Sequence, residues 1–337
     1  MSTSTSPKPK ILLLGEIIHA QKEWQGLSDI AELVTAESKN REEFIHDLST
    51  KYSDVTAIYR TLFSVGITGR FDEDLVRHFP KSLKFVGHFG AGYDQIDVHA
   101  LSAQGIQISN TPNAVVPGTA DTNIFLVIGA LRNFSYGQYQ LRQNKWLSSV
   151  ELGHDPQGKV LGILGMGGIG QAVRDRAVPL GFDKIIYYNR RRLPADLEKD
   201  SEYKPTIDEL LAEADVISIN VPLNKETKHL INKETISKMK DGVVIVNTAR
   251  GPVINEQDLV DGLESGKIGA VGLDVFEHEP VINPGLLNNP RTLLLPHMGT
   301  HSYESRFDME NLVIENLRSG LTTGKLITLV PEQQGAF

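Results

Sequence analysis

The sequence predicts an α/β protein built from two doubly wound, parallel-sheet domains. Its 337 residues fit about two domains at roughly 150 residues each. Short apolar runs alternate with longer amphipathic stretches, which is the pattern of strand–helix–strand units. The turn signal Thr111-Pro112-Asn113 separates the apolar runs into two series. Two sheets are therefore expected, one from each series.

The expected strands are short apolar runs bounded by polar or glycine-containing segments. The first series comprises Lys10–Leu14, Val55–Tyr59, Lys84–Phe89 and Ile106–Ser109. The second series comprises Val160–Leu164, Lys184–Tyr188, Val216–Asn220, Gly242–Asn247, Ala270–Val275 and Thr292–Leu295.

Two long helices are expected to connect the domains. One is predicted over Gly118–Phe134, directly after the turn signal, and one over Ser302–Ser319, after the last strand. The second helix is expected to return the chain to the first domain, where Leu326–Val330 would add a closing strand. The substrate-binding domain would then be discontinuous, with residues 1–115 and 303–337, and residues 116–302 would form the second domain. A hinge and an active-site cleft are expected between the two.

Composition excludes several classes of protein. Apolar residues make up 40% and charged residues 23%, as in ordinary folded domains. No apolar run reaches the ~18 residues that cross a bilayer, and a net charge of −8 argues against nucleic-acid binding. The absence of cysteine excludes disulfides, thiolate catalysis and cysteine-ligated metals. Met1–Lys10 lacks the apolar core of a secretory signal and the arginines of a transit peptide, so a cytoplasmic location is expected.

A glycine-rich turn lies between an expected strand and an expected helix. The strand Val160–Leu164 leads into Gly165-Met166-Gly167-Gly168-Ile169-Gly170. Gly165 allows a tight turn, Gly167 lets the backbone approach a pyrophosphate, and Gly170 lets helix and strand pack closely. The N–H groups at the start of the helix would then bind the phosphates. This context predicts a dinucleotide-binding Rossmann domain.

The end of the next strand indicates which dinucleotide binds. NAD enzymes usually place Asp or Glu there to hold the ribose 2′-hydroxyl. Here the strand ends in Asn189, and the following Arg190 or Arg191 could pair with a 2′-phosphate. NADP(H) is therefore expected to be preferred, with NAD(H) bound more weakly. The alternative interpretation is that the arginines form a solvated surface turn.

Three charged side chains follow three different strands of the second series. Arg250 follows Gly242–Asn247, Glu279 lies in the acidic segment after the next strand, and His297 follows the last strand. Carboxyl ends of parallel strands share one edge of a sheet, where ligands bind. A metal site is not expected, because no zinc-protease pattern surrounds His297 and His301.

With these motifs, the chain resembles the D-isomer-specific 2-hydroxyacid dehydrogenases over essentially its whole length. The motifs occur in the family's order, at Gly165–Gly170, Asn247–Gly251, Leu273–Pro280 and Pro296–Gly299. The resemblance is strongest to fungal NADPH-dependent glyoxylate/hydroxypyruvate reductases, on the segments Gly90–Asp97, Tyr188–Arg190 and His297–His301.

The resemblance implies a role for each catalytic candidate. Arg250 would hold the substrate carboxylate and polarise its carbonyl, and His297 would act as the general acid/base. Glu279, which directly precedes Pro280, would pair with His297 and fix its ring. In the other domain, small residues after a strand let backbone N–H groups face a carboxylate. The resemblance implies that this loop holds the substrate carboxylate through Ala91 and Gly92, whereas an ordinary glycine turn is the alternative.

The resemblance also implies further contacts to the cofactor. Asp274 corresponds to the residue that binds the nicotinamide amide, and Val221, Pro222 and Thr227 resemble the loop on the adenine side. The remaining expected cofactor contacts are Thr119, Thr248, Ala249, Gly299 and Thr300.

The implied activity is the NADPH-dependent reduction of a small 2-oxo acid to its D-2-hydroxy acid. Glyoxylate and hydroxypyruvate are the expected substrates, and a larger acid of the D-mandelate type stays an alternative. A dinucleotide-sensing, corepressor-like scaffold is the other alternative, although Asn189 and Arg190 and the lack of a long tail count against it. A homodimer is expected, since Trp146 lies in a segment that family members use for dimer contact.

Overall fold

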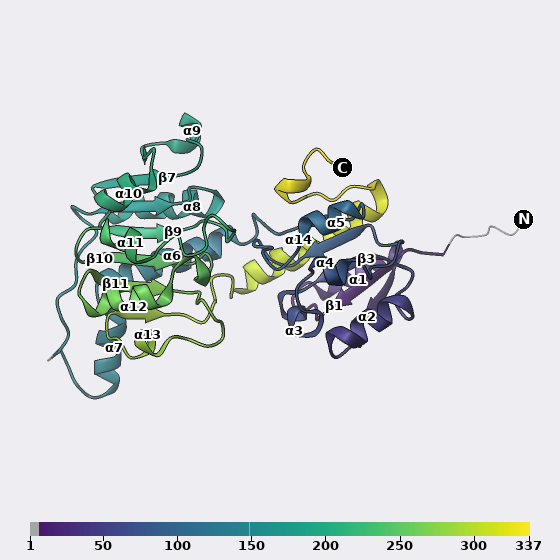
Figure 1. Ribbon diagram of the computed structural model, residues 1–337, viewed down its shortest axis with the longest axis horizontal. Coiled ribbons are helices and arrows are strands. Elements are labelled where there is room, and N and C mark those ends of the chain that lie inside the picture. The colour runs from purple at the N-terminus through teal and green to yellow at the C-terminus, as the bar shows by residue number, and fades with distance from the viewer. Residues whose placement is uncertain (1–6, 148) are drawn as a thin grey trace, which may run out of the picture. The chain divides into compact units, whose positions relative to one another are not determined.

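Two parallel β-sheets organise residues 7–147 and 149–337, which the computed structural model of the chain describes (Figure 1). Unit 1 combines the described residues up to Val115 with Ser302–Phe337, and unit 2 is Val116–His301. The expected fold class, two parallel-sheet α/β domains, is confirmed. The first six residues of the N-terminal segment, on which the expected location partly rests, lie outside the described residues.

Unit 1 contains a five-stranded sheet of order β2-β1-β3-β4-β5, in which every pair is parallel. Its strands are β1 (Lys10–Leu14), β2 (Glu32–Thr35), β3 (Val55–Arg60), β4 (Phe85–His88) and β5 (Gln107–Ser109). Its helices are α1 (Gln21–Gly26), α2 (Arg41–Ser49), α3 (Val65–Thr68), α4 (Glu73–Val76), α5 (Val98–Ala103) and α14 (Tyr303–Thr323). Short 3₁₀ turns cover Leu27–Asp29, Leu62–Ser64 and Pro331–Gln333.

Two features of unit 1 differ from the sequence-based expectation. β2 was not predicted, because this edge strand is half-exposed and pairs only with β1, so it lacks a continuous apolar run. The closing strand expected over Leu326–Val330 was wrong. That segment makes one antiparallel bridge, from Leu329 to Ser109, and the buried Gln333 side chain then accepts from the Ile108 N–H.

The chain's last helix is fastened to the segment that follows its first strand. Ser302 caps α14 by accepting a hydrogen bond from the Ser305 N–H. Further along the helix, the buried Glu310 carboxylate accepts from the backbone N–H groups of Ile18, His19 and Ala20, at 3.1, 2.7 and 2.7 Å. These bonds join the two ends of the chain within unit 1.

Unit 2 contains a seven-stranded parallel sheet of order β12-β11-β10-β9-β6-β7-β8. Its strands are β6 (Val160–Leu164), β7 (Lys184–Tyr188), β8 (Glu202–Tyr203), β9 (Val216–Ile219), β10 (Val243–Asn247), β11 (Ile268–Leu273) and β12 (Thr292–Leu294). Its helices are α6 (Val116–Leu131), α7 (Phe134–Arg142), α8 (Gly168–Ala177), α9 (Ala195–Glu198), α10 (Ile207–Glu213), α11 (Lys233–Ser237), α12 (Glu256–Glu264) and α13 (Pro284–Leu287). Short 3₁₀ turns cover Val178–Leu180 and Gly251–Val253.

Helices cover both faces of the unit 2 sheet (Figure 1). Side chains alternate along each strand, so one set packs with α10, α11 and α12 in one apolar cluster. The other set packs with α6 and α8 in a second cluster. The helix expected over Gly118–Phe134 is divided, since α6 ends at Leu131 and Asn133 takes a left-handed conformation before α7.

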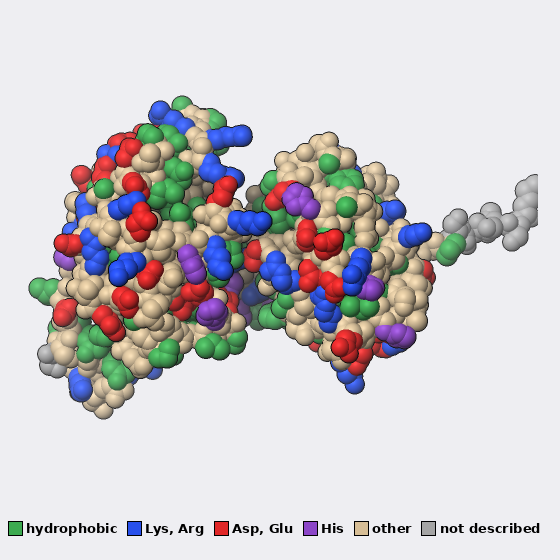
Figure 2. Space-filling model, in the orientation of Figure 1, with side chains coloured by type: hydrophobic (Ala, Val, Ile, Leu, Met, Phe, Trp, Pro, Cys, Tyr) green, Lys and Arg blue, Asp and Glu red, His purple; other side chains and the backbone are tan. Residues whose placement is uncertain are grey.

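The strand order reverses between β6 and β9, next to the glycine-rich turn that follows β6. In a doubly wound sheet such a reversal opens a crevice at the carboxyl ends of the strands, where ligands bind. Acidic and basic side chains are intermixed over the visible face of each unit (Figure 2). Within the described part of the chain, no helix combines the length and apolar character that crossing a bilayer requires.

We expect Glu310→Ala to destabilise unit 1, because it leaves three backbone N–H groups without an acceptor. The loss should be about 2 kcal/mol, the order of the penalty for unsatisfied buried donors. Thermal unfolding followed by circular dichroism would measure it. Glu315→Ala, at an exposed position of the same helix, is the control and should leave the melting temperature unchanged. Equal melting temperatures for both variants would contradict the assignment.

Candidate active site

The glycine-rich turn of unit 2 requires glycine at two positions, at one because of the backbone conformation and at the other because of close packing. Gly165 has a φ of +98°, which residues with a side chain rarely adopt. A Cβ on Gly170 would lie 2.2 Å from the Gly165 carbonyl oxygen, so any side chain there would separate α8 from β6. Nothing lies within 4 Å of a Cβ placed on Gly167, and this residue precedes α8 without a side-chain cap. The open first turn of α8 fits a phosphate group.

Asn189 holds this turn in place. The Met166 N–H donates to Asn189 Oδ1 at 2.7 Å, and the Gly165 N–H donates to the Tyr188 carbonyl at 3.0 Å. The residue at the position that usually holds the ribose in NAD enzymes is thus neutral and already bonded to the phosphate-binding turn. Its role in building the turn was not foreseen from the sequence.

The three arginines that follow Asn189 have different environments. Arg192 forms an ion pair with the buried Glu198, at 2.6 and 2.8 Å. Arg190 and Arg191 are exposed, and the nearest acid to Arg190, Glu226, is 3.8 Å away. Arg192 therefore belongs to the fold, while Arg190 and Arg191 present their charge to solvent.

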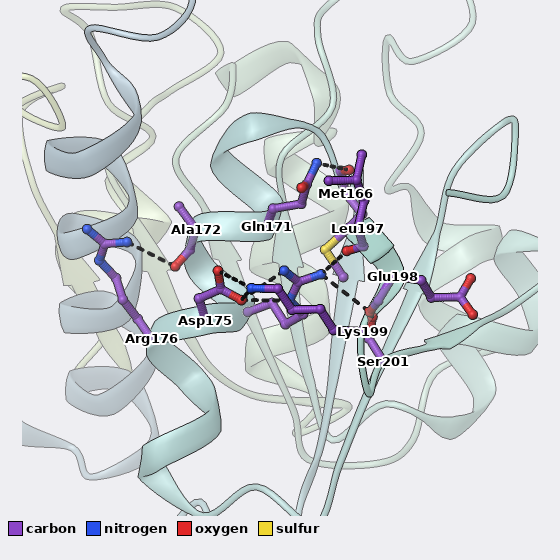
Figure 3. A network of polar contacts seen from close by, with 10 residues as sticks. Met166, Gln171, Ala172, Asp175, Arg176, Leu197, Glu198, Lys199 and Ser201 are labelled. Carbon is purple, nitrogen blue, oxygen red and sulfur yellow. Dashed lines mark hydrogen bonds and ion pairs between the residues drawn. The ribbon is translucent and has the colours of Figure 1, made fainter. Parts of the chain in front are cut away.

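Glu198 belongs to a polar network that connects α8 to the end of α9 and the residues directly after it (Figure 3). Arg174, buried in α8, donates to the carbonyls of Leu197 and Glu198 and contacts Asp175 at 2.8 Å. Lys199 donates to the same Asp175 at 2.9 Å. The network fixes the segment that follows the exposed arginines, and so limits where those arginines can reach.

The expected adenine-side loop is closed by its own side chains. Thr227 Oγ1 donates to the Pro222 carbonyl at 2.6 Å and accepts from the Asn224 N–H at 2.9 Å. Val221 packs against the apolar core of unit 2. Thr227 therefore shapes the loop that carries Glu226 beside Arg190.

His297 and Glu279 are brought together, as their expected pairing requires. His297 Nδ1 lies 2.8 Å from Glu279 Oε2, and the other carboxylate oxygen accepts from the Phe276 N–H at 2.9 Å. Burial alone would raise the pKa of Glu279, but His297, the Phe276 N–H and the charge of Arg250 together hold that pKa below its usual value. The carboxylate thus stays ionised and orients the imidazole.

Asp274 supports His297 through the backbone. This buried carboxylate accepts from the N–H groups of Met298 and Gly299, at 2.7 and 2.8 Å. Burial raises the pKa of Asp274 in spite of these two bonds. The His297 backbone has a φ of +52°, a costly conformation for histidine, and the bonds from Asp274 help to hold it. The role expected for Asp274, binding the nicotinamide amide, stays a prediction.

Arg250 lies in a turn that a buried asparagine shapes. Asn247 donates to the Arg250 carbonyl and accepts from the Ala249 N–H, both at 2.9 Å. The backbone of Gly251 passes so close to Phe276 that a Cβ there would lie 1.9 Å from the Phe276 carbonyl carbon. This approach brings the Arg250 turn beside the segment that carries Glu279.

A second imidazole–carboxylate pair supports the same segment and was missed from the sequence. His229 Nε2 lies 2.5 Å from Glu277 Oε1. Glu277 and the buried Glu256 each accept from the other's backbone N–H. Glu277 was considered from the sequence only as a rival to Glu279. Its partner lies 48 residues earlier in the chain, and no local pattern connects the two.

The remaining expected cofactor residues lie at the same carboxyl-end turns or near them. Thr119, in α6, is buried beside Gly299, and Thr248 Oγ1 accepts from the buried Asn123 side chain at 2.9 Å. Ala249 packs against the core, and Thr300 is half-buried. These turns follow different strands and line one edge of the unit 2 sheet.

Ala91 and Gly92 belong to unit 1, in the loop after β4. The Gly90 carbonyl accepts from the Thr111 N–H at 3.0 Å, and the Ala91 carbonyl from the Asn110 side chain at 2.7 Å. Within the described part of the chain, the N–H groups of Ala91 and Gly92 donate to no acceptor. These donors suit an anion.

The unit 2 site can bind a dinucleotide and move one proton. The turn after β6 offers unoccupied N–H donors, and His297, oriented by Glu279, can exchange a proton through its other ring nitrogen. Arg250 adds a guanidinium that can pair with a carboxylate. The residues that the structure describes contain no cluster of acids and histidines that could hold a metal ion.

We expect Glu279→Gln to lower stability in a pH-dependent way. The folded-state pKa of Glu279 lies below its unfolded value of about 4.3, so its contribution is present above that pH and is lost as the pH falls through the folded pKa. The carboxylate is 37% exposed, so the contribution should stay below about 1 kcal/mol.

Thermal unfolding from pH 3 to pH 7 would test this expectation. The melting temperatures of the wild type and Glu279→Gln should differ at neutral pH and converge in acid. Glu264→Gln, at an exposed position at the end of α12, is the matched control. A difference that grows as the pH falls would contradict the expected sign.

Comparisons with known proteins agree with this geometry. The family described as "D-isomer specific 2-hydroxyacid dehydrogenase, NAD binding domain" matches residues 124–299. The chain is 53% identical to 4-methyl-2-oxopentanoate reductase A of Aspergillus oryzae, over 98% of this chain and 100% of that protein. It is 49% identical to glyoxylate reductase 1 of Saccharomyces cerevisiae, over 98% of this chain and 96% of that protein.

A solved structure shows the same fold over nearly the whole chain. A glyoxylate reductase from Paecilomyes thermophila superimposes with a TM-score of 0.95, at 52% identity over 97% of this chain and 100% of that one. Sequence, fold and site geometry lead to one conclusion. The chain belongs to the D-isomer-specific 2-hydroxyacid dehydrogenase family.

Proposed function

We propose that this 2-oxo acid reductase uses NADPH and acts on a small acid, with glyoxylate and hydroxypyruvate as its substrates. One observation carries the catalytic part of the proposal, namely the 2.8 Å contact between His297 Nδ1 and Glu279 Oε2. It lies at the edge of the sheet that also carries the dinucleotide-binding turn.

The residues of the proposed site divide substrate binding and proton transfer among them. When bound, the nicotinamide supplies the hydride that adds to the carbonyl carbon of the acid. His297 gives a proton from Nε2 to the carbonyl oxygen, since Nδ1 is engaged by Glu279. The ionised Glu279 stabilises the imidazolium that donates this proton. Arg250 pairs with the substrate carboxylate and polarises the carbonyl.

The proposed preference for NADPH rests on three neighbouring residues. Asn189 brings no negative charge to the position of the 2′-phosphate, and its Oδ1 is bonded to Met166. Arg190 and Arg191 directly follow Asn189 after the end of β7, and both are exposed. A guanidinium binds a phosphate through charge-assisted, bidentate hydrogen bonds.

A larger 2-oxo acid is the second candidate substrate. The name of the Aspergillus oryzae relative, at 53% identity, states a branched-chain 2-oxo acid, whereas the yeast relative at 49% is named for glyoxylate. An assay with glyoxylate, hydroxypyruvate, 4-methyl-2-oxopentanoate and phenylglyoxylate would separate these substrates by kcat/KM. No turnover with any of the four acids would favour the scaffold alternative.

We also propose that the protein acts as a cytoplasmic homodimer. Large apolar side chains are exposed on α7 and the segment after it, namely Phe134, Tyr139, Leu141, Trp146 and Leu147. Such a patch is typical of an interaction surface. Trp146, 76% exposed, lies within it.

We expect His297→Asn to lower kcat by roughly 10²- to 10⁴-fold, the usual contribution of general acid catalysis. Asparagine keeps a polar side chain but cannot deliver a proton at neutral pH. NADPH oxidation at 340 nm would give kcat, and a fluorescence titration should give an unchanged NADPH affinity. His301→Asn, an exposed histidine four positions along, is the control and should keep full activity. A variant at position 297 with normal kcat would refute the acid/base role.

We expect Arg190→Ala to raise KM for NADPH by about tenfold, since a charge-assisted hydrogen bond contributes roughly 1.5–3 kcal/mol. KM for NADH should not change, because NADH lacks the 2′-phosphate. Steady-state kinetics with each cofactor would measure both values. Lys233→Ala, which removes an exposed cation on α11, is the control. An equal loss with both cofactors would contradict the proposed phosphate contact.

A further inference from the structure

A buried arginine–histidine pair lies directly below the Ala91–Gly92 loop of unit 1. Arg60 and His88 are the last residues of β3 and β4, and they face each other in the parallel register. Arg60 is 0% exposed and His88 1%. Arg60 NH1 lies 3.1 Å from His88 Nδ1, and His88 Nε2 lies 3.0 Å from the Gly92 carbonyl oxygen.

These two contacts select one form of the His88 ring. A guanidinium can only donate, so His88 Nδ1 must accept and carries no proton. A backbone carbonyl can only accept, so His88 Nε2 must carry the proton. Both partners therefore require the same state, the neutral ring protonated at Nε2. The ring transmits the position of Arg60 to the Gly92 carbonyl.

Three successive carbonyls of the loop are bonded to unit 1 itself. The Gly90 carbonyl accepts from the Thr111 N–H, the Ala91 carbonyl from Asn110 and the Gly92 carbonyl from His88. In a trans peptide the N–H of the next residue points opposite to the carbonyl. The N–H groups of Ala91, Gly92 and Tyr93 are thus turned away from these donors, an arrangement that leaves backbone donors able to bind an anion.

We propose that Arg60 and His88 are positioning residues for the substrate carboxylate, because they hold the Gly90–Gly92 loop in the orientation that presents its N–H groups. This inference rests on the proposed function and adds to it that the N–H groups of the Ala91–Gly92 loop bind the substrate carboxylate, as the family resemblance implies. Other contacts keep Arg60 in place. It donates to Gln95 Oε1 at 3.1 Å, and its guanidinium lies over the Phe71 ring at 4.9 Å from the centroid.

A histidine is needed here for its bonding as well as its volume. A Cβ on Gly90 would lie 2.8 Å from His88 Nε2, so the ring fills the space beneath the loop. Leucine would fill much of that space but could not donate to the Gly92 carbonyl. Glutamine can present an amide N–H near the position of Nε2 and should restore part of the function.

The test compares His88→Leu with His88→Gln, and uses His99→Leu at an exposed position of α5 as the matched control. We expect His88→Leu to raise KM for glyoxylate by at least about tenfold, the effect of one hydrogen bond lost from a charged ligand. The NADPH affinity should not change, and kcat should fall much less than kcat/KM. His88→Gln should recover part of KM, and the control should match the wild type.

Nitrogen-15 spectra give a readout that does not depend on turnover. The His88 ring of the wild type should show the neutral form protonated at Nε2. Oxalate, an unreactive dicarboxylate, should shift the amide resonances of Ala91 and Gly92 in the wild type but not in His88→Leu. Asn110→Ala tests the same loop through the Ala91 carbonyl if His88→Leu does not fold.

Different outcomes refute the two proposals separately. An unchanged KM in a folded His88→Leu variant, or a His88 ring protonated at Nδ1, would overturn the positioning role. A wild-type protein that fails to oxidise NADPH with every 2-oxo acid tested would refute the proposed function instead. In that case the oxalate titration still decides whether His88 holds an anion-binding loop.

Discussion

Both sites depend on one constraint, namely polar side chains, buried or half-buried, that hydrogen-bond to backbone groups at the carboxyl ends of parallel strands. Asp274 holds the turn of His297, Asn247 the turn of Arg250, and Asn189 the glycine-rich turn. In unit 1, His88 and Asn110 do the same for the Ala91–Gly92 loop. A turn after a strand has no ladder partners for its backbone, and a buried group left unpaired costs about 1–3 kcal/mol. The side chains that remove this cost also fix where the functional groups point.

Close backbone packing places these turns beside one another. At Gly251 the chain passes within contact of the Phe276 carbonyl, so the Arg250 turn and the Glu279 segment can adjoin only if residue 251 lacks a side chain. Glu256 and Glu277, each accepting from the other's backbone N–H, then hold the Glu279 segment, and the His229 ring contacts the Glu277 carboxylate. Glu279 accepts one further bond, from the Phe276 N–H, and its other oxygen contacts His297. Packing therefore sets the geometry of the proposed acid/base pair.

The arginines near the glycine-rich turn fall into two groups, those paired within the fold and those exposed to solvent. Arg192 forms an ion pair with the buried Glu198, and Arg174 forms one with Asp175 and donates to two carbonyls, so both belong to the framework. Arg190 and Arg191 stay exposed on a framework that those bonds make rigid. A phosphate reaching this edge would meet guanidinium groups whose backbone is already ordered, which lowers the entropy cost of binding.

The sequence by itself determined the fold class and the family, because apolar periodicity and glycine spacing are local patterns. It located β1, β6 and β7 at their bounds, and it singled out Glu279 and His297, which the structure places in contact. It did not reveal β2, whose half-exposed edge position removes the apolar run, nor the division of the long helix at Asn133. Only the tertiary structure decided that His229 meets Glu277 and that Arg60 faces His88 across two strands. These pairs join residues far apart in the chain, and their partners are chosen by sheet register and backbone packing, which no local pattern encodes.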